Sequence, residues 1–263
     1  MGQVVGVIGI GNMGRGIAKN LANAGHTLLI WDVEESARTS FTGKARIVTP
    51  EKMAAEADVV IFVVPGSAQI EQMLPSMLKA AQPGLILWDF TTSDPVHTKR
   101  LAAQAAEADV PYMDAGMTGG GAKGADEGTM TLMIGGAEAV LEHSRPVLQA
   151  CAKELIHLGP SGAGHTMKVV HNLITHTNFL ACSEAGRLAE AAGIGLADMI
   201  RVFNAGNARS FISERRFPDH ILSETWDGRS RIFNLRKDVG MAVAFEAGEW
   251  YIGLRLPTQR WSG

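Results

Sequence analysis

The chain lacks the features that mark secreted, membrane and nucleic-acid-binding proteins. Its two cysteines, Cys151 and Cys182, cannot form a disulfide framework, so we expect a reducing compartment. A formal net charge of −3 gives no electrostatic case for binding nucleic acid. The longest apolar run, Val59–Pro65, is too short to cross a membrane. The first predicted strand begins by Val4 and leaves no room for a signal peptide, so the sequence predicts a cytoplasmic protein.

The composition is otherwise typical of a globular protein, since 46% of the 263 residues are apolar and 19% are charged. Short apolar segments alternate with helical patterns, which predicts an α/β protein whose doubly wound parallel sheet is covered by helices on both faces. The predicted helices include residues 12–24, a short segment after Glu34, residues 69–80, and residues 95–108 with Asp94 as their cap. The predicted strands are Val4–Ile8, Thr27–Trp31, Val59–Val64, Leu85–Asp89, Tyr112–Asp114, Thr131–Ile134 and Glu154–Leu158.

The pattern changes after Gly164. Residues 166–192 have helical periodicity without a strand, and Gly193 fits a helix C-cap. The remainder, to about Gly248, is also predicted to be helical, with turns at residues 206–208 and 227–230. We therefore predict two domains: residues 1–163 around the sheet, and residues 164–263 built from helices alone.

The first predicted strand leads into a Gly-x-Gly-x-x-Gly turn and directly into a helix. Gly9 permits the tight turn, Gly11 lets the backbone approach a pyrophosphate, and Gly14 lets the helix pack closely on the strand. The pattern predicts a dinucleotide site that includes Asn12 and Met13. A glycine-rich turn of some other α/β protein is the alternative.

Asp32 follows the second predicted strand, about 20 residues beyond the glycines. Its carboxylate would accept hydrogen bonds from ribose hydroxyls and repel a 2′-phosphate, which favours NAD over NADP. An ordinary surface aspartate is the alternative. We assign Val64, Pro65 and Thr91 to the same cofactor site.

A glycine-dense loop is predicted where the strand ending at Asp114 stops. The Thr118 hydroxyl and the consecutive backbone N–H groups of Gly119 and Gly120 would form an anion-binding concavity suited to a substrate carboxylate. A flexible connection is the alternative, because glycine clusters are usually turns.

Lys168, Asn172 and Thr175 fall at helical spacing and would share one face of the long helix. A lysine at the head of a partly apolar helix can exchange a proton with a substrate hydroxyl while hydride moves to nicotinamide. The alternative is a lysine that reaches into solvent, which is the commoner case.

Four histidines lie close together in the sequence, at positions 157, 165, 171 and 176. No pair has the spacing of a helical two-histidine site, and no cysteine or carboxylate completes a ligand set. We predict no metal site.

Together, four spaced motifs resemble the β-hydroxyacid dehydrogenase family, which includes 3-hydroxyisobutyrate dehydrogenase, tartronate semialdehyde reductase and 6-phosphogluconate dehydrogenase. The resemblance runs over nearly the whole chain. It implies a Rossmann-type N-terminal domain, a helical C-terminal domain, and a cleft between them in which a short 3-hydroxy acid is oxidised by NAD(P). The motifs are the glycine turn with Met13-Gly14 and Asn20-Leu21, Asp114 with Thr118-Gly119-Gly120, Gly162-x-Gly164-x-x-x-Lys168-x-x-x-Asn172, and Lys237-Asp238.

The resemblance also implies roles for individual residues. Lys168 would be the catalytic acid/base, and Asn172 would help hold the reacting hydroxyl or carboxylate. Thr118 and the two glycines after it would seat the substrate carboxylate, and Lys237 would close over nicotinamide and substrate. Val33 stands where NADP-using members often carry arginine.

Three departures from the family pattern change these expectations. Gly116-Met117 replaces the usual Pro-Val, so we expect a more mobile loop and a differently shaped pocket. Thr175 stands where 6-phosphogluconate dehydrogenase has a second catalytic acid. The sequence ends at Gly263, where relatives continue, which we take as evidence against a phosphorylated substrate. We also expect the protein to be a homodimer or a homotetramer, with the helix at 166–192 in the dimer interface.

The leading hypothesis is an NAD-dependent dehydrogenase of small 3-hydroxy acids. An imine reductase-like enzyme is the first alternative, although such enzymes usually have Asp or Tyr in place of the catalytic lysine. A dinucleotide-binding or redox-sensing protein without turnover is the second, and it conflicts with the set of Lys168, Asn172 and Thr118.

Overall fold

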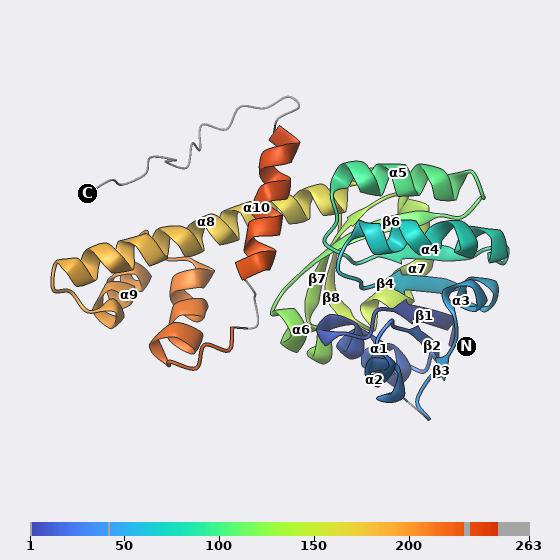
Figure 1. Cartoon of the computed structure of the whole chain (residues 1–263), viewed down its shortest axis with the longest axis horizontal. Coiled ribbons are helices and arrows are strands. Elements are labelled where there is room, and N and C mark those ends of the chain that lie inside the picture. The colour runs from blue at the N-terminus through green and yellow to red at the C-terminus, as the bar shows by residue number, and fades with distance from the viewer. Residues whose placement is uncertain (1, 42, 229–231, 247–263) are drawn as a thin grey trace. The chain divides into compact units, whose positions relative to one another are not determined.

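Short runs of aliphatic residues pair into one sheet in the computed structural model, which describes residues 2–41, 43–228 and 232–246. Contacts divide the chain into two units, residues 1–168 and 169–263, and the sheet lies in the first. Its order is β3-β2-β1-β4-β5-β6-β7-β8 (Figure 1). The strands are β1 Val4–Ile8, β2 Thr27–Trp31, β3 Arg46–Ile47, β4 Val59–Phe62, β5 Ile86–Asp89, β6 Tyr112–Thr118, β7 Met130–Gly135 and β8 Ala152–His157.

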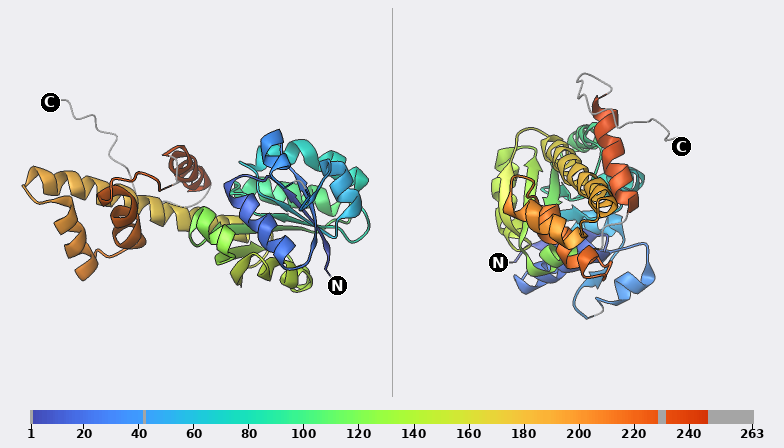
Figure 2. Two further views of the ribbon diagram at one scale, coloured as in Figure 1. Left: turned by 90° about the horizontal axis from the view of Figure 1, so that it is seen from below. Right: turned by 90° about the vertical axis from the view of Figure 1, so that its left-hand side faces the viewer.

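Helices cover both faces of this sheet (Figure 2). Successive residues of each central strand enter opposite hydrophobic clusters: in β4, Val59 and Ile61 join one cluster, and Val60 and Phe62 join the other. Residues of α1, α6 and α7 pack in the first cluster, and residues of α3, α4 and α5 in the second. The helices of this unit are α1 Asn12–Asn23, α2 Glu35–Thr39, α3 Pro50–Glu56, α4 Ser67–Ala80, α5 Pro95–Ala106, α6 Gly121–Glu127 and α7 Glu138–Gln149.

The predicted α/β class with a doubly wound sheet is confirmed. β1 and β2 have the predicted bounds, and the Asp94 side chain caps α5 by accepting from the Val96 N–H at 2.8 Å. The strand order reverses between β1 and β4, and ligands of open α/β sheets bind outside the carboxyl ends of the strands at such a switch point.

Two expectations about the sheet were wrong. The sheet is not all parallel, because β7 runs antiparallel to β6. The strand that was expected to end at Asp114 continues to Thr118, so Gly116 and Met117 are paired residues of β6 rather than part of a mobile loop. Backbone pairing with β7 keeps the strand extended here, although glycine has low strand propensity. The two-residue strand β3 was not predicted because both of its residues are exposed.

All the regular secondary structure in the described part of the second unit is helical. It contains most of α8 Ala163–Ala191, α9 Leu196–Ala205, the π-helix η1 Ile212–Leu222 and α10 Ile232–Glu246. Gly193 follows α8 with φ +79°, as predicted for a C-cap. A small cluster of buried residues forms the core: Cys182, Met199, Ile200, Ile212 and Phe217. The predicted interruption at 227–230 and the helix end near Gly248 lie partly outside the described residues.

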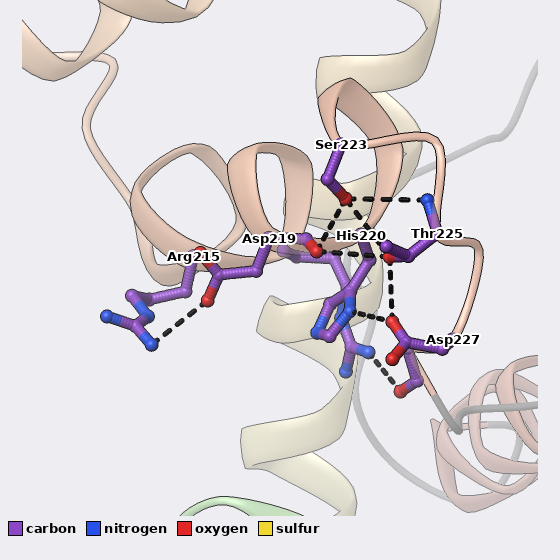
Figure 3. Close-up of polar contacts among 8 residues, drawn as sticks. Arg215, Asp219, His220, Ser223, Thr225 and Asp227 are labelled. Carbon is purple, nitrogen blue, oxygen red and sulfur yellow. Dashed lines mark hydrogen bonds and ion pairs between the residues drawn. The ribbon is translucent and has the colours of Figure 1, made fainter.

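A polar cluster ties the chain after η1 back onto this helix (Figure 3). The Asp227 carboxylate lies 2.6 Å from His220 Nδ1 and accepts from Thr225 Oγ1 at 2.8 Å. These contacts lower the pKa of Asp227, with the His220 hydrogen bond as the largest cause.

Within the described ranges, we find no helix with the length and apolar character needed to span a membrane.

Candidate active site

The glycine turn between β1 and α1 is closely packed at two of its glycines and open at the third. A Cβ at Gly9, which has φ +97°, would lie 2.3 Å from the carbonyl oxygen of Val63. A Cβ at Gly14 would lie 1.8 Å from the carbonyl oxygen of Gly9. A Cβ at Gly11 would have no neighbour within 4 Å, and α1 starts there without a side-chain cap. The backbone N–H groups of Asn12 and the residues after it therefore begin the helix beside open space, which suits a phosphate group.

Asp32 lies against this turn. Its Oδ2 accepts a hydrogen bond from the N–H of Ile10 at 2.6 Å, and its Oδ1 accepts one from Glu34 at 2.9 Å. A carboxylate can accept about four hydrogen bonds, so both oxygens keep capacity for ribose hydroxyls. The Asp32 carboxylate therefore also fixes the backbone of the turn that leads into α1.

The residues beyond Asp32 offer little to a 2′-phosphate. Val33 is 82% exposed and carries no charge. The nearby Arg38 guanidinium donates to the carbonyl oxygens of Asp32 and Val33, at 2.5 and 3.2 Å, and stacks 4.8 Å above the Trp31 ring. The two hydrogen bonds use one guanidinium nitrogen, Nη1, and close the β2–α2 turn.

The other residues assigned to the cofactor follow neighbouring strands at the same edge. Val64 and Pro65 follow β4, and a Val64 methyl would lie 3.3 Å from a Cβ placed on Gly9. Thr91 follows β5, and its N–H donates to Asp89 Oδ1 at 2.8 Å. Its buried Oγ1 has no hydrogen-bond partner among the described residues, as expected of a hydroxyl that a ligand would satisfy. The turn, the open glycine and this hydroxyl fit a dinucleotide.

Asp114 holds the start of α8. This fully buried carboxylate accepts from the N–H of Gly162 at 2.7 Å and from the N–H of His165 at 2.9 Å. Both N–H groups lie at the helix start, where no intrahelical acceptor exists. A charged acceptor near a helix N-terminus is stabilising, so the end of α8 that carries Lys168 is fixed to β6.

Lys168 packs directly on β6. Alternate residues of a strand share a face, so Asp114, Gly116 and Thr118 lie on one side of β6. A Cβ at Gly116 would lie 2.6 Å from Lys168 Cβ and 3.0 Å from the carbonyl oxygen of Gly164. The glycine is therefore needed for the lysine to come this close to β6, two residues before Thr118 on the same face of the strand.

The chain reverses direction after Thr118 through glycines in the left-handed region. Gly119 has φ +100° and Gly120 has φ +93°, which side-chain-bearing residues rarely adopt. Gly124 packs against the turn, because a Cβ there would lie 1.8 Å from the carbonyl oxygen of Gly119. The turn is thus a defined structure, and its two glycine N–H groups directly follow Thr118 in the chain.

In the second unit, Asn172 is held by a residue to which the sequence analysis gave no role. The Asn172 amide donates to Asp238 Oδ2 at 2.7 Å, and His176 Nε2 lies 3.3 Å from the same oxygen. Lys237 Nζ lies 3.7 Å from Asp238 Oδ1. Asp238 is only 6% exposed, so this carboxylate organises the polar side chains of α8 and α10. The one available signal was its place beside Lys237 in the last motif.

Other predicted polar residues serve local structure. The Thr175 hydroxyl donates to the carbonyl oxygen of His171 at 3.0 Å, a bond within α8. His165 Nδ1 lies 2.7 Å from Thr98 Oγ1, and His157 Nε2 lies 2.8 Å from a backbone carbonyl oxygen. Within the described residues, no group of three or more His, Cys, Asp or Glu side chains could hold a metal ion.

The fold and the turn define a class: a dinucleotide-binding protein with a glycine-rich turn at the switch point of its sheet. Comparison with known proteins gives the family. Residues 4–159 match the NAD binding domain of 6-phosphogluconate dehydrogenase, and residues 162–256 match the NAD-binding domain of NADP-dependent 3-hydroxyisobutyrate dehydrogenase. The chain belongs to the β-hydroxyacid dehydrogenase family, as the sequence motifs indicated, and is an NAD-linked oxidoreductase of that family.

Relatives of known name span most of the chain. 2-(Hydroxymethyl)glutarate dehydrogenase of Eubacterium barkeri is 32% identical over 250 residues, covering 93% of this chain and 82% of that protein. 2-Hydroxy-3-oxopropionate reductase of Escherichia coli K12 is 34% identical over 246 residues, covering 91% and 82%. A structure of Mycobacterium tuberculosis 3-hydroxyisobutyrate dehydrogenase with L-serine has a TM-score of 0.82 at 27% identity, covering 94% and 87%.

Proposed function

We propose that this protein is an NAD-dependent dehydrogenase of small 3-hydroxy acids similar to 3-hydroxyisobutyrate, with Lys168 as the general acid/base. The observation that carries the proposal is the packing of Lys168 on Gly116, with Asp114 holding the helix start and Thr118 on the same face of β6. The names of the relatives support the substrate class, since each acts on, or was studied with, a short hydroxy acid or its oxo form.

The cofactor would lie across the glycine turn. Gly9, Gly11, Asn12, Met13 and Gly14 would hold the pyrophosphate through the start of α1, with Asp32 at the ribose. Val64, Pro65 and Thr91 would line the same edge of the sheet. NAD would be preferred because Asp32 would repel a 2′-phosphate and Val33, the residue after it, carries no charge.

The chain's own residues would supply binding and proton transfer, and the bound NAD supplies the hydride acceptor. The Thr118 hydroxyl and the N–H groups of Gly119 and Gly120 would bind the substrate carboxylate. Lys168 would remove the hydroxyl proton as the adjacent carbon gives up its hydride, and would return it in the reverse reaction. Asn172, oriented by Asp238, would hold the reacting oxygen.

Lys237 would close over nicotinamide and substrate. A homodimer, or a homotetramer, built on the helix at 166–192 stays a prediction, as do the cytoplasmic location and the domain boundary at residue 163.

The test is turnover of a panel of hydroxy acids with NAD and with NADP, followed by absorbance of the reduced cofactor. The panel contains 3-hydroxyisobutyrate, glycerate, serine, threonate and 6-phosphogluconate. We expect turnover of at least one of the first four acids, faster with NAD than with NADP. NADH binding without turnover of any acid would contradict the proposal and favour a non-catalytic, redox-sensing protein.

A further inference from the structure

The short helix α6 begins at the glycine turn assigned to the substrate carboxylate and is fixed to α1 at its other end. A Cβ at Gly16 of α1 would lie 2.6 Å from backbone atoms of Ala125 and Asp126, so α6 backbone packs directly on this glycine. The Asn20 amide of α1 donates to the carbonyl oxygens of Ala125 and Asp126, at 2.8 and 3.3 Å. These carbonyls lie in the last turn of α6, where intrahelical donors run out.

Gly16 and Asn20 are four residues apart and share one face of α1. Figure 1 and Figure 2 show α6 lying against this helix. α6 has seven residues and is therefore about 10 Å long, so a shift at its last turn moves its first turn too. Gly120 is the residue at which α6 begins, and Gly124 of α6 packs on the carbonyl oxygen of Gly119, so both glycines would move with the helix.

We propose that Asn20 is a positioning residue for substrate binding. It fixes α6 on α1, and thereby sets where the N–H groups of Gly119 and Gly120 lie relative to the dinucleotide turn at the start of the same α1. This inference rests on the proposed function, because it assigns Asn20 to the substrate loop. It adds a residue that touches neither substrate nor cofactor.

The same pair of helices offers a matched control. Lys19, next to Asn20, forms an ion pair of 2.6 Å with Asp126, and both side chains are about half exposed, at 47% and 59%. Exposed ion pairs contribute little, so Lys19→Ala should leave the docking of α6 intact.

The experiment measures KM for the hydroxy acid, KM for NAD, kcat and the melting temperature in Asn20→Ala, Gly16→Ala and Lys19→Ala. We expect Asn20→Ala to raise KM for the acid on the order of 10-fold, as lost hydrogen bonds predict, with KM for NAD and kcat within about two-fold. Gly16→Ala, which pushes α6 away from α1, should also raise KM for the acid. Lys19→Ala should change none of them.

Two results would overturn the inference. One is a lower melting temperature in Asn20→Ala with an unchanged KM for the acid, which indicates a structural role alone. The other is an equal rise in both KM values, which places the effect at the cofactor. If the unaltered protein oxidises no hydroxy acid, the proposed function fails and this inference fails with it. If the unaltered protein is active but Asn20→Ala has the same KM for the acid, only the inference is refuted.

Discussion

The two units of the chain hold their candidate site residues by different physical means. In the first unit, Lys168 is placed by backbone: a buried carboxylate bonds two N–H groups at the helix start, and a glycine lets the lysine stem contact the strand. In the second unit, the Asn172 amide is oriented by side chains, those of Asp238 and the neighbouring His171. The first arrangement has little freedom to shift, because backbone atoms have no alternative rotamers and the Asp114 side chain is fully buried, whereas the side-chain contacts around Asn172 can rearrange. We therefore expect changes in the first unit to cost more activity.

The largest effect is expected at Asp114. In Asp114→Asn, an amide NH₂ would face one of the two N–H groups that the carboxylate now accepts. The start of α8 would shift and Lys168 would move with it. Misplacement by about 1 Å can cost 10²-fold, so we expect kcat to fall by on the order of 10²-fold.

A matched control separates catalysis from stability. Asp58 is another carboxylate of the first unit that accepts a backbone N–H, that of Val4, at 2.8 Å. Asp58→Asn should lower the melting temperature with kcat nearly unchanged. If Asp114→Asn keeps the kcat of the unaltered protein, backbone placement of Lys168 is refuted.

A smaller effect is expected at Asp238. Asp238→Asn replaces a charged acceptor of Asn172 and His176 with a neutral one. Hydrogen bonds to charged groups are worth ~1.5–3 kcal/mol, and part of this should be retained, so kcat/KM should fall roughly 10-fold. His176→Gln, which removes only the longer contact, should have less effect. A loss in Asp238→Asn larger than in Asp114→Asn would reverse the comparison between the units.

The smallest effect is expected in the polar cluster of Figure 3. Its contacts lower the pKa of Asp227, so this carboxylate stabilises the fold above the ordinary Asp pKa and ceases to do so as pH falls through the lowered value. Asp227→Asn should lower the melting temperature by roughly 1–3 °C near neutral pH and by less below the lowered pKa of Asp227, with kcat unchanged. Thermal melts across pH measure this, and a difference that stays as large below that pKa would contradict it.

Much of the first unit could be predicted because its signals are local. The apolar runs of β1 and β2, the glycine turn and the Asp94 cap each depend on a few consecutive residues. β6 was predicted to end too early, because Gly116 interrupts the apolar pattern and only pairing with the distant β7 keeps it extended. Similarly, the antiparallel direction of β7 has no local signature.

The candidate residues could be predicted more easily than their supports. Lys168 and Asn172 stand at a regular spacing within one helix, so the sequence itself relates them. Asp114 and Gly162 are 48 positions apart, and Asn172 and Asp238 are 66 apart. Such contacts are set by tertiary packing, which one sequence does not reveal, and this is why the roles of Asp114 and Asp238 could not be predicted.

The central claim is that Lys168 transfers the proton, and its most direct test is to remove the lysine and supply an amine from solution. The measurement is kcat of Lys168→Ala with the best hydroxy acid and NAD, with and without added methylamine. Loss of a positioned acid/base should lower kcat by about 10²–10⁴-fold, and the amine should restore part of it in proportion to its concentration. A kcat of Lys168→Ala within a few-fold of that of the unaltered protein would contradict the account.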